Sequence, residues 1–265
     1  MNLFSSIINE IIETFKFRFV VFNFVQSTLK LRYQKTLLGF FWSILGPMLH
    51  YLVVGIVFSY TMRNGIANYA AYMFTGALYF NVISGVTSRS PIIFISNEHF
   101  IKKIYIPKMV FILDTVLVEI VNFLLGFLAL LCLGLALNKV NLSIHYSIIP
   151  LAILLVIMLT TGIASIISVA GVYFRDLTHI IPVLLQATFF LTPILYQIEV
   201  MPPKFQLLIR LNPLTYFIEI FRLPIVFNQW PQFDYILICS IISLLVFTFG
   251  LIVMKKFENR IVFRL

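Results

Sequence analysis

The sequence lacks the motifs by which proteins hold nucleotides. None of its eleven glycines is followed by lysine, so it contains no P-loop for the phosphates of ATP. It also has no Asp-x-Asp pair that would hold a metal and a nucleotide sugar. We therefore expect the energy for any work done by this chain to come from another subunit.

Clusters that carry catalysis or bind metals are missing as well. The four histidines are scattered, whereas metal sites need ligands at close spacing. Cys132 and Cys239 lie within apolar runs, which indicates neither a disulfide nor a metal site. No catalytic residue, metal or cofactor is predicted in this chain. A membrane enzyme acting on polyprenyl-linked sugars, which would gather carboxylates or histidines at one interface, is the less favoured class.

Charged residues are scarce, and long apolar runs dominate instead. Hydrophobic residues make up 61% of the 265 residues and charged residues only 11%, far from the composition of a soluble domain. The net charge of +9 would suggest nucleic acid in a soluble protein. Here the basic residues flank the apolar runs, so membrane topology explains them better. The sequence predicts an all-α integral membrane protein that contacts lipid and no nucleic acid.

Six apolar runs come near the ~20 residues that a bilayer core requires, and they predict six transmembrane helices in one domain over residues 37–265. The predicted spans are Leu37–Met62, Ile66–Val86, Met109–Leu137, Ser147–Phe174, Leu177–Ile198 and Phe233–Met254.

The N-terminal segment, residues 1–36, has an apolar stripe at spacings of three and four, which predicts an amphipathic helix lying in the headgroup plane. Its members are Ile7, Ile8, Ile11, Ile12, Phe15, Phe19 and Phe22.

The basic residues also predict orientation. Fourteen of the 19 fall on the side that holds both termini, which the positive-inside rule assigns to the cytoplasm. These are Lys16, Arg18, Lys30, Arg32, Lys35, Arg89, Lys102, Lys103, Lys108, Arg175, Lys255, Lys256, Arg260 and Arg264.

The segment 199–230 is apolar, yet four prolines and several charges prevent it from being an ordinary span. Two short amphipathic helices, Lys204 to Arg210 and Leu214 to Leu223, are predicted with a hinge at Asn212-Pro213. Asn212 is expected to cap the second helix, with Pro213 at its first position. We expect a re-entrant helical hairpin on the outer side; an amphipathic loop flat on the surface is the alternative.

We also expect a short helix in the cytoplasmic segment 91–108. Ser96 or Asn97 is expected to cap it and Pro107 to end it. Phe100, Ile101 and Ile104 form a small apolar face with lysines around it. This face suits either a knob that docks into a cytoplasmic partner or a surface that binds anionic lipid.

Two acidic residues lie within the start of the third span, where charges usually face protein or water. Asp114 is expected to pair with Lys108 or Arg175. Glu119 lies deeper and is a functional candidate, although a structural hydrogen bond is favoured.

Aromatic residues line up in two of the predicted spans. Phe40, Tyr51 and Phe58 fall within about 20° of one another on a helix, and Phe189 and Tyr196, seven apart, would share a face. Such faces stack on sugar rings, but helix packing and the interfacial aromatic belt, to which Trp42 would belong, explain them as well.

Four segments together resemble a known family, the permease subunit of type-2 ABC exporters, in its branch for O-antigen, capsular polysaccharide or teichoic acid. They are LRYQKTLLGFFWSILGPMLHYLVVGIVF, NEHFIKKIYIPK, VYFRDLTHIIPVLLQATFFLTPILY and LNPLTYFIEIFR. They occur in the family's order, and RYQKTLLGFFW together with NPLTYFIEIFR is quite specific.

The resemblance implies a homodimer in the bacterial cytoplasmic membrane. Two copies of a cytoplasmic ATPase, which binds ATP and Mg, would drive export of a polyprenyl-linked polysaccharide. Drug or small-lipid exporters of the same superfamily are the alternative. The implied roles form three groups: channel lining by Phe40, Trp42, Tyr51, Phe58, Phe189 and Tyr196; an outer gate with Asn212, Pro213, Tyr216, Glu219 and Arg222; and ATPase coupling by Arg32, Tyr33, Asn97, Glu98, Phe100, Ile101, Lys102 and Lys103.

Overall fold

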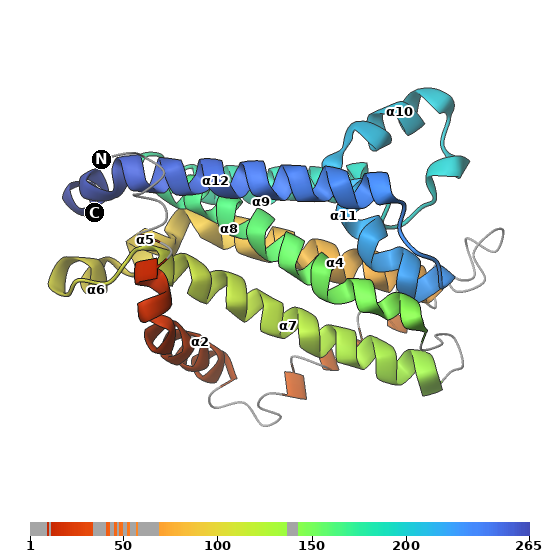
Figure 1. Cartoon of the computed structure of the whole chain (residues 1–265), viewed down its shortest axis with the longest axis horizontal. Helices are drawn as coiled ribbons and strands as arrows, with labels where there is room; N and C mark the ends of the chain where they lie inside the picture. Colours follow the sequence, from red (N-terminus) through yellow and green to blue (C-terminus); the bar gives the residue numbers. More distant parts are fainter. Residues whose placement is uncertain are drawn as a thin grey trace.

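The computed structural model describes residues 10, 12–33, 41–42, 45–46, 48–49, 52–53, 57, 69–136 and 143–265. Over these residues the secondary structure is helical throughout, and long helices lie side by side in an elongated bundle (Figure 1). The predicted all-α class is confirmed for this part of the chain.

The α-helices and short helical turns follow one another along the chain. The α-helices are α2 (Arg18–Tyr33), α4 (Tyr69–Arg89), α5 (Ile93–Ser96), α6 (Glu98–Lys103), α7 (Met109–Ala136), α8 (Ile149–Tyr173), α9 (Leu177–Leu191), α10 (Pro203–Leu211), α11 (Pro213–Arg222) and α12 (Phe233–Arg264). Between them lie the 3₁₀ turns η2 (Ser90–Ile92), η3 (Ile144–Ile148) and η4 (Ile198–Val200), and the π turn η5 (Leu223–Phe227).

Three stretches are long and apolar enough to cross a membrane: Met109–Leu135, Ile144–Tyr173 and Phe233–Glu258. They match the predicted third, fourth and sixth spans within a few residues. Helix α4 has 21 residues and covers most of the predicted second span. Most of the first predicted span falls outside the described residues, so the count of six stays a prediction.

Helix α9 is shorter than predicted. It ends at Leu191 instead of continuing to Ile198. The cause is Pro193, because a proline disfavours helical backbone in the residue before it, and Thr192 has extended angles (φ −103°, ψ 138°). The chain then turns back through residues 192–197, which puts this end of α9 beside the segment predicted to form the outer hairpin.

The core of the bundle is packed most closely where α8 meets α12. A side chain at Gly162 would overlap the backbone carbonyl of Val246, and one at Gly250 would approach the Gly162 carbonyl. Small residues let membrane helices approach this closely. At the end of the bundle that the sequence predicts to face the cytoplasm, which we call the cytoplasmic end, Gly171 does the same for η2, because a Cβ there would overlap Pro91. These close contacts make α8 the central helix of the bundle.

Helix α2 lies across the cytoplasmic end of the bundle, with Val21 and Val25 buried against α7. The described members of the predicted apolar stripe point away from the bundle: Ile12, Phe15, Phe19 and Phe22 are all half exposed or more. An outward apolar stripe suits a helix that lies against lipid, as the sequence predicts.

Candidate functional site

The two helices of the outer hairpin form as predicted, and Asn212 joins them. Its Oδ1 accepts a hydrogen bond from the Leu214 backbone N–H at 3.1 Å, while Pro213 occupies the first turn. Its Nδ2 donates to Thr192 Oγ1 at 2.9 Å. The cap prediction is confirmed, and Asn212 additionally ties the hinge to the residues that follow α9. Helix α11 packs into the bundle, whereas α10 projects from it (Figure 1).

Arg222, at the end of α11, is the largest fully buried side chain. Its Nη1 donates to Glu219 Oε1 at 2.7 Å, and its guanidinium lies 3.8 Å from the centre of the Tyr72 ring. The Nε and Nη2 atoms make no hydrogen bond within the described part of the chain. Burying this guanidinium costs free energy, because one carboxylate and one aromatic ring replace the water around it and two of its donor atoms are unused.

Helix α4 makes room for this guanidinium. A Cβ at Gly76 would overlap Arg222 Nη2, so only glycine fits there without displacing the arginine. One turn earlier, Tyr72 covers the guanidinium and donates through its hydroxyl to the Tyr196 carbonyl at 3.0 Å. Tyr69 donates to the Leu195 carbonyl at 2.7 Å. Helices α4 and α11 and the residues that follow α9 thus form one polar cluster, which we call the outer cluster.

Gly76, Tyr69 and Tyr72 are members that sequence reasoning missed. All three lie in an apolar run, where only the position of Arg222 in space reveals their role. Of the remaining predicted gate residues, Tyr216 lies on the outer part of α11. It donates to the Arg210 carbonyl at 2.8 Å and packs edge-on against Tyr235.

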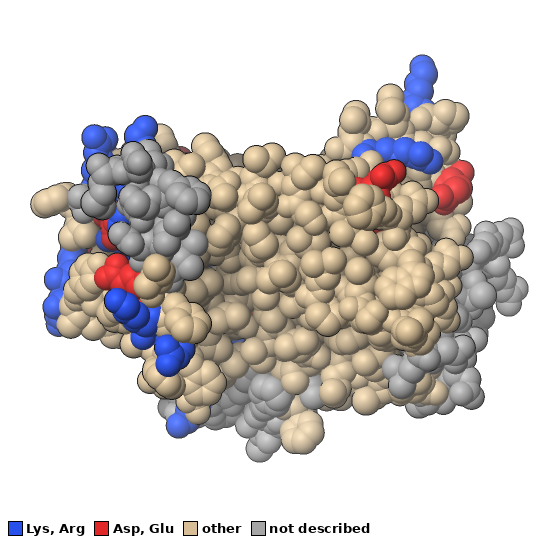
Figure 2. Space-filling model, in the orientation of Figure 1, with Lys and Arg blue, Asp and Glu red and all other residues tan. Residues whose placement is uncertain are grey.

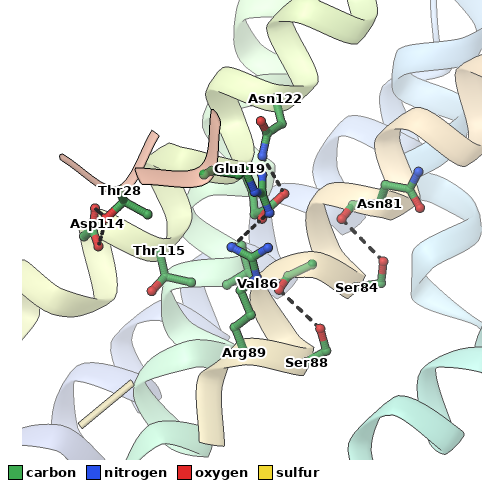
Figure 3. Close-up of polar contacts among 12 residues, drawn as sticks. Thr28, Asn81, Ser84, Val86, Ser88, Arg89, Asp114, Thr115, Glu119 and Asn122 are labelled. Atoms are coloured by element: carbon green, nitrogen blue, oxygen red, sulfur yellow. Dashed lines mark hydrogen bonds and ion pairs between the residues drawn. The ribbon is translucent and has the colours of Figure 1, made fainter. Parts of the chain in front are cut away.

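A second polar cluster lies nearer the cytoplasmic end, between α2, α4 and α7 (Figure 3). Glu119 accepts an ion pair from Arg89 at 3.2 Å and a longer one from Arg32 at 3.8 Å. Asn122 Nδ2 donates to its other oxygen at 3.2 Å. The structural role favoured for Glu119 fits this geometry. Arg32, predicted to contact an ATPase, has its guanidinium near Glu119 of α7; the side chain of Tyr33 lies outside the described part of the structure.

Asp114 was expected to pair with Lys108 or Arg175, and that prediction is wrong. Its carboxylate accepts a hydrogen bond from the Thr28 hydroxyl of α2 at 3.2 Å (Figure 3). Lys108 instead pairs with Glu258 of α12 at 3.7 Å. The partner of Asp114 is 86 residues away in the chain, and local spacing cannot show such a contact.

The short helix in segment 91–108 is α6, but its capping differs from the prediction. Asn97 precedes the helix, yet its side chain makes no cap and Nδ2 donates back to the Ile93 carbonyl at 2.8 Å. Ser96 bonds within α5. Along α6, Glu98 pairs with Lys102 at 2.6 Å, and this hydrogen bond lowers the pKa of the Glu98 carboxyl.

The apolar face of the segment packs on one side and is open on the other. The ring of Phe100 packs edge-on against Phe24 of α2 at 5.3 Å, and Ile101 packs against the core. Phe100 and Ile104 remain about half exposed. Lys102 and Lys103 lie in the last turn of α6. This arrangement leaves an apolar and basic surface that projects from the end of the bundle (Figure 1).

The N-terminal residues, the segment 91–108 and the end of α12 are linked by charge. Lys255 of α12 pairs with Glu10 at 2.9 Å and with Glu258 at 2.7 Å, and Glu258 also holds Lys108. Tyr105 donates to Glu13 at 2.9 Å. Burial lowers the pKa of the Lys108 ammonium, against the opposing effect of Glu258. We call these linked residues the cytoplasmic network.

The predicted channel residues fall into two groups. Phe40, Tyr51 and Phe58 lie outside the described residues, and Trp42 is about half exposed. Phe189 and Tyr196 do not share a helix face, because α9 ends between them. Phe189 packs edge-on against Phe80 of α4, and Tyr196 donates to the Phe190 carbonyl at 2.9 Å.

The outward side of α9 carries a different aromatic ring. Phe190 is 59% exposed, and Val183, Leu184 and Leu191 are also open. Most of α9 is exposed within the described chain, and Ile181 is its one fully buried residue. The sequence signal that would have separated Tyr196 from Phe189 is Pro193, because it ends the helix before Tyr196.

Figure 2 shows charged side chains gathered at the two ends of the molecule, with an uncharged band between them. That band, the three apolar spans and the buried polar clusters define an integral membrane protein. The family model for the ABC-2 type transporter matches residues 20–226. The chain belongs to this family.

Relatives include export permeases. The chain is 29% identical over 233 residues to the O-antigen export system permease protein RfbA of Klebsiella pneumoniae, covering 88% of this chain and 89% of that protein. It is 31% identical to the protein of the same name from Myxococcus xanthus, over 77% of this chain and 78% of that protein. The polysialic acid transport protein KpsM of Escherichia coli is 21% identical, over 82% of this chain and 86% of that protein. The expected family is confirmed.

Proposed function

We propose that this chain is the membrane-spanning permease subunit of an ATP-driven exporter of lipid-linked polysaccharide. The observation that carries the proposal is the similarity to O-antigen export permeases over nearly the whole of both chains. The relative named for polysialic acid transport supports a polysaccharide over a drug or small lipid. The permease itself is not an enzyme, and hydrolysis takes place in a separate ATPase subunit.

The proposed assembly is a homodimer with two copies of that ATPase, in the bacterial cytoplasmic membrane and with both termini in the cytoplasm. Two features support it. The outward face of α9 is an apolar surface without cover in the described chain, as expected of a helix that meets the second copy or lines the path between copies. The basic residues gather at the end that holds α6 and the end of α12 (Figures 1 and 2).

In this assembly the segment 91–108 and the N-terminal segment 1–36 receive the motion of the ATPase. The Phe24–Phe100 contact joins them, so a displacement of α6 also moves α2. Helix α2 is in turn tied to α4 and α7 by Arg32, Glu119 and Arg89. These contacts give a physical route from the docking surface to the helices beside the export path.

The segment 199–230 is the proposed outer gate. Its helix α11 is anchored through the outer cluster, whereas α10 buries only Ile209 and exposes apolar side chains. The anchored half keeps its place while the projecting half is free to move. A sugar polymer is hydrated and amphipathic by ring face, so a path with aromatic rings such as Phe190 would hold it weakly at many points.

The test is to deplete the chain in a bacterium that makes it and to locate the lipid-linked glycan. We expect polymer to accumulate in the cytoplasm, with synthesis intact and surface glycan lost. Unchanged surface glycan would refute the polysaccharide assignment and direct attention to drugs and small lipids. Intact synthesis also rules against a role in sugar transfer.

A further inference from the structure

Helix α12 is longer than a membrane span needs to be. Its 32 residues extend about 48 Å at 1.5 Å per residue, against a hydrocarbon core of ~30 Å. The apolar stretch ends at Glu258. The last turns therefore project beyond the span, at the same end of the molecule as α6 (Figure 1).

One face of this projecting part is fixed to the bundle. Ile261 and Met254 are buried. Phe257 packs edge-on against Tyr173 of α8 at 5.9 Å, and the Arg264 guanidinium lies 4.8 Å from the same tyrosine ring. These contacts from the end of α8 hold the tip of α12 in a defined direction.

The opposite face is open, and its composition is unusual for a solvated surface. Lys256, Arg260 and Phe263 are exposed at positions i, i+4 and i+7, which places them on one side of the helix. The Phe263 ring is 89% exposed, the highest value among the large apolar side chains described. We call these three residues the α12 tip face.

The helix turns that carry this face meet the segment 91–108 on their other side. On the helix turns next to the tip, Lys255 reaches Glu10, and Glu258 reaches Lys108. The cytoplasmic network thus places the tip of α12 beside both elements that are proposed to meet the ATPase. Basic side chains gather at this end of the molecule (Figure 2).

We propose that the α12 tip face is a third docking surface for the ATPase subunit. Phe263 enters an apolar pocket, and Lys256 and Arg260 meet acidic residues around it. Buried aromatic anchors with a charged rim are the usual form of such contacts. A lipid-binding helix lies in the plane of the headgroups, whereas α12 continues along the axis of the bundle. The inference rests on the proposed function, which supplies the partner.

Photo-crosslinking tests the contact directly. Benzoylphenylalanine replaces Phe263 in the purified complex of the chain with its P-loop ATPase subunit; cysteine chemistry is avoided because Cys132 is exposed. The matched control is Phe233, a 74% exposed phenylalanine near the opposite end of α12. We expect an ATPase crosslink from position 263 and none from position 233. Crosslinks to lipid alone would overturn the inference in favour of a membrane surface.

Substitution measures the contribution of the face. Phe263→Ala and Lys256→Glu/Arg260→Glu should each weaken ATPase binding about tenfold, which corresponds to ~1.4 kcal/mol. Phe233→Ala should bind like the original chain, and all variants should keep its Tm because the changed side chains are exposed. Unchanged affinity in the tip variants overturns this inference alone. An original chain that binds no ATPase and exports no glycan refutes the proposed function instead.

Discussion

The outer cluster uses charge in the opposite way to the polar groups at the cytoplasmic end, which are the cluster around Glu119 and the cytoplasmic network. In the outer cluster a single arginine, fully buried, depends on one carboxylate and one aromatic ring. At the cytoplasmic end, Glu119 and Glu258 each pair with two cations, and most of the cations reach solvent: Lys255 and Arg32 are each 33% exposed and Arg89 is 41% exposed.

This difference separates a rigid attachment from an adjustable one. A buried charge without its partner cannot be solvated, so every member of the outer cluster is needed to keep α11 on α4. A charge that reaches water can exchange partners at small cost. The cytoplasmic end therefore suits a surface that moves with a bound ATPase, and the outer cluster suits a fixed base for the gate.

The largest effect is expected from Arg222→Ala, which leaves Glu219 unpaired and opens a cavity beneath Tyr72. Breaking a buried pair in this way costs about 3–5 kcal/mol. We expect a large fall in Tm and in the yield of folded protein, measured by fluorescence-detected size exclusion after heating. Arg210→Ala, on the exposed side of α10, is the control. Equal Tm values for the two variants would contradict the outer cluster.

The double variant Arg222→Met/Glu219→Leu sharpens this result, because removing both charges can be neutral or stabilising. We expect it to regain most of the Tm lost by Arg222→Ala. A double variant as unstable as the single one would show that the pair itself, rather than the unpaired carboxylate, sets the stability.

A smaller loss is expected from Gly76→Ala. The added methyl group overlaps Arg222 Nη2, and this guanidinium cannot move aside freely because Glu219 and Tyr72 hold it. Overpacking of this kind costs about 1–3 kcal/mol. The control is Gly46→Ala, since no atom of the described residues lies within 4 Å of a Cβ at Gly46. If both variants melted at the same temperature, the close approach of α4 to α11 would be wrong.

At the cytoplasmic end, Glu119→Gln should lower the free energy of unfolding by less, about 1 kcal/mol, because Arg32 and Arg89 can turn to solvent. The effect should shrink as salt rises from about 0.01 M to 1 M, since salt screens the exposed arginines. Tm measured across this range checks it. A loss as large as that of Arg222→Ala, independent of salt, would remove the distinction between the two clusters.

The smallest effect is expected from Glu98→Ala in α6. Its pair with Lys102 is exposed, and such pairs add little to stability. We expect an unchanged Tm, measured in parallel with the variants above. A clear drop in Tm would show that α6 depends on its charges for folding, contrary to a surface kept for docking.

Local patterns in the sequence predicted the elements whose causes are local. Asn212 and Pro213 marked the start of α11, because a capping side chain and a first-turn proline act within a few residues. Long apolar runs located α7, α8 and α12 for the same reason. Pro193 gave an equally local signal that was missed, and the error moved Tyr196 onto a helix face that does not exist.

Contacts across the bundle were beyond such reasoning. Thr28 of α2 meets Asp114 of α7, and Lys255 of α12 meets Glu10, only because the fold brings these distant segments together at one end of the bundle. The space for the Arg222 guanidinium depends on Gly76. A glycine in an apolar run does not indicate which side chain will lie beside it in the folded protein. The spacing of residues in the sequence predicts which side chains share a face of one helix. Which element that face contacts is decided by packing in the folded protein.

The account is tested most directly by transport in proteoliposomes that hold the chain and its ATPase subunit. With lipid-linked polysaccharide in the outer leaflet and ATP outside, we predict ATP-dependent movement of glycan into the lumen. An ATPase variant that lacks the P-loop lysine should abolish it. ATP hydrolysis without glycan movement, when the same vesicles move a drug or a short lipid, would contradict the central claim.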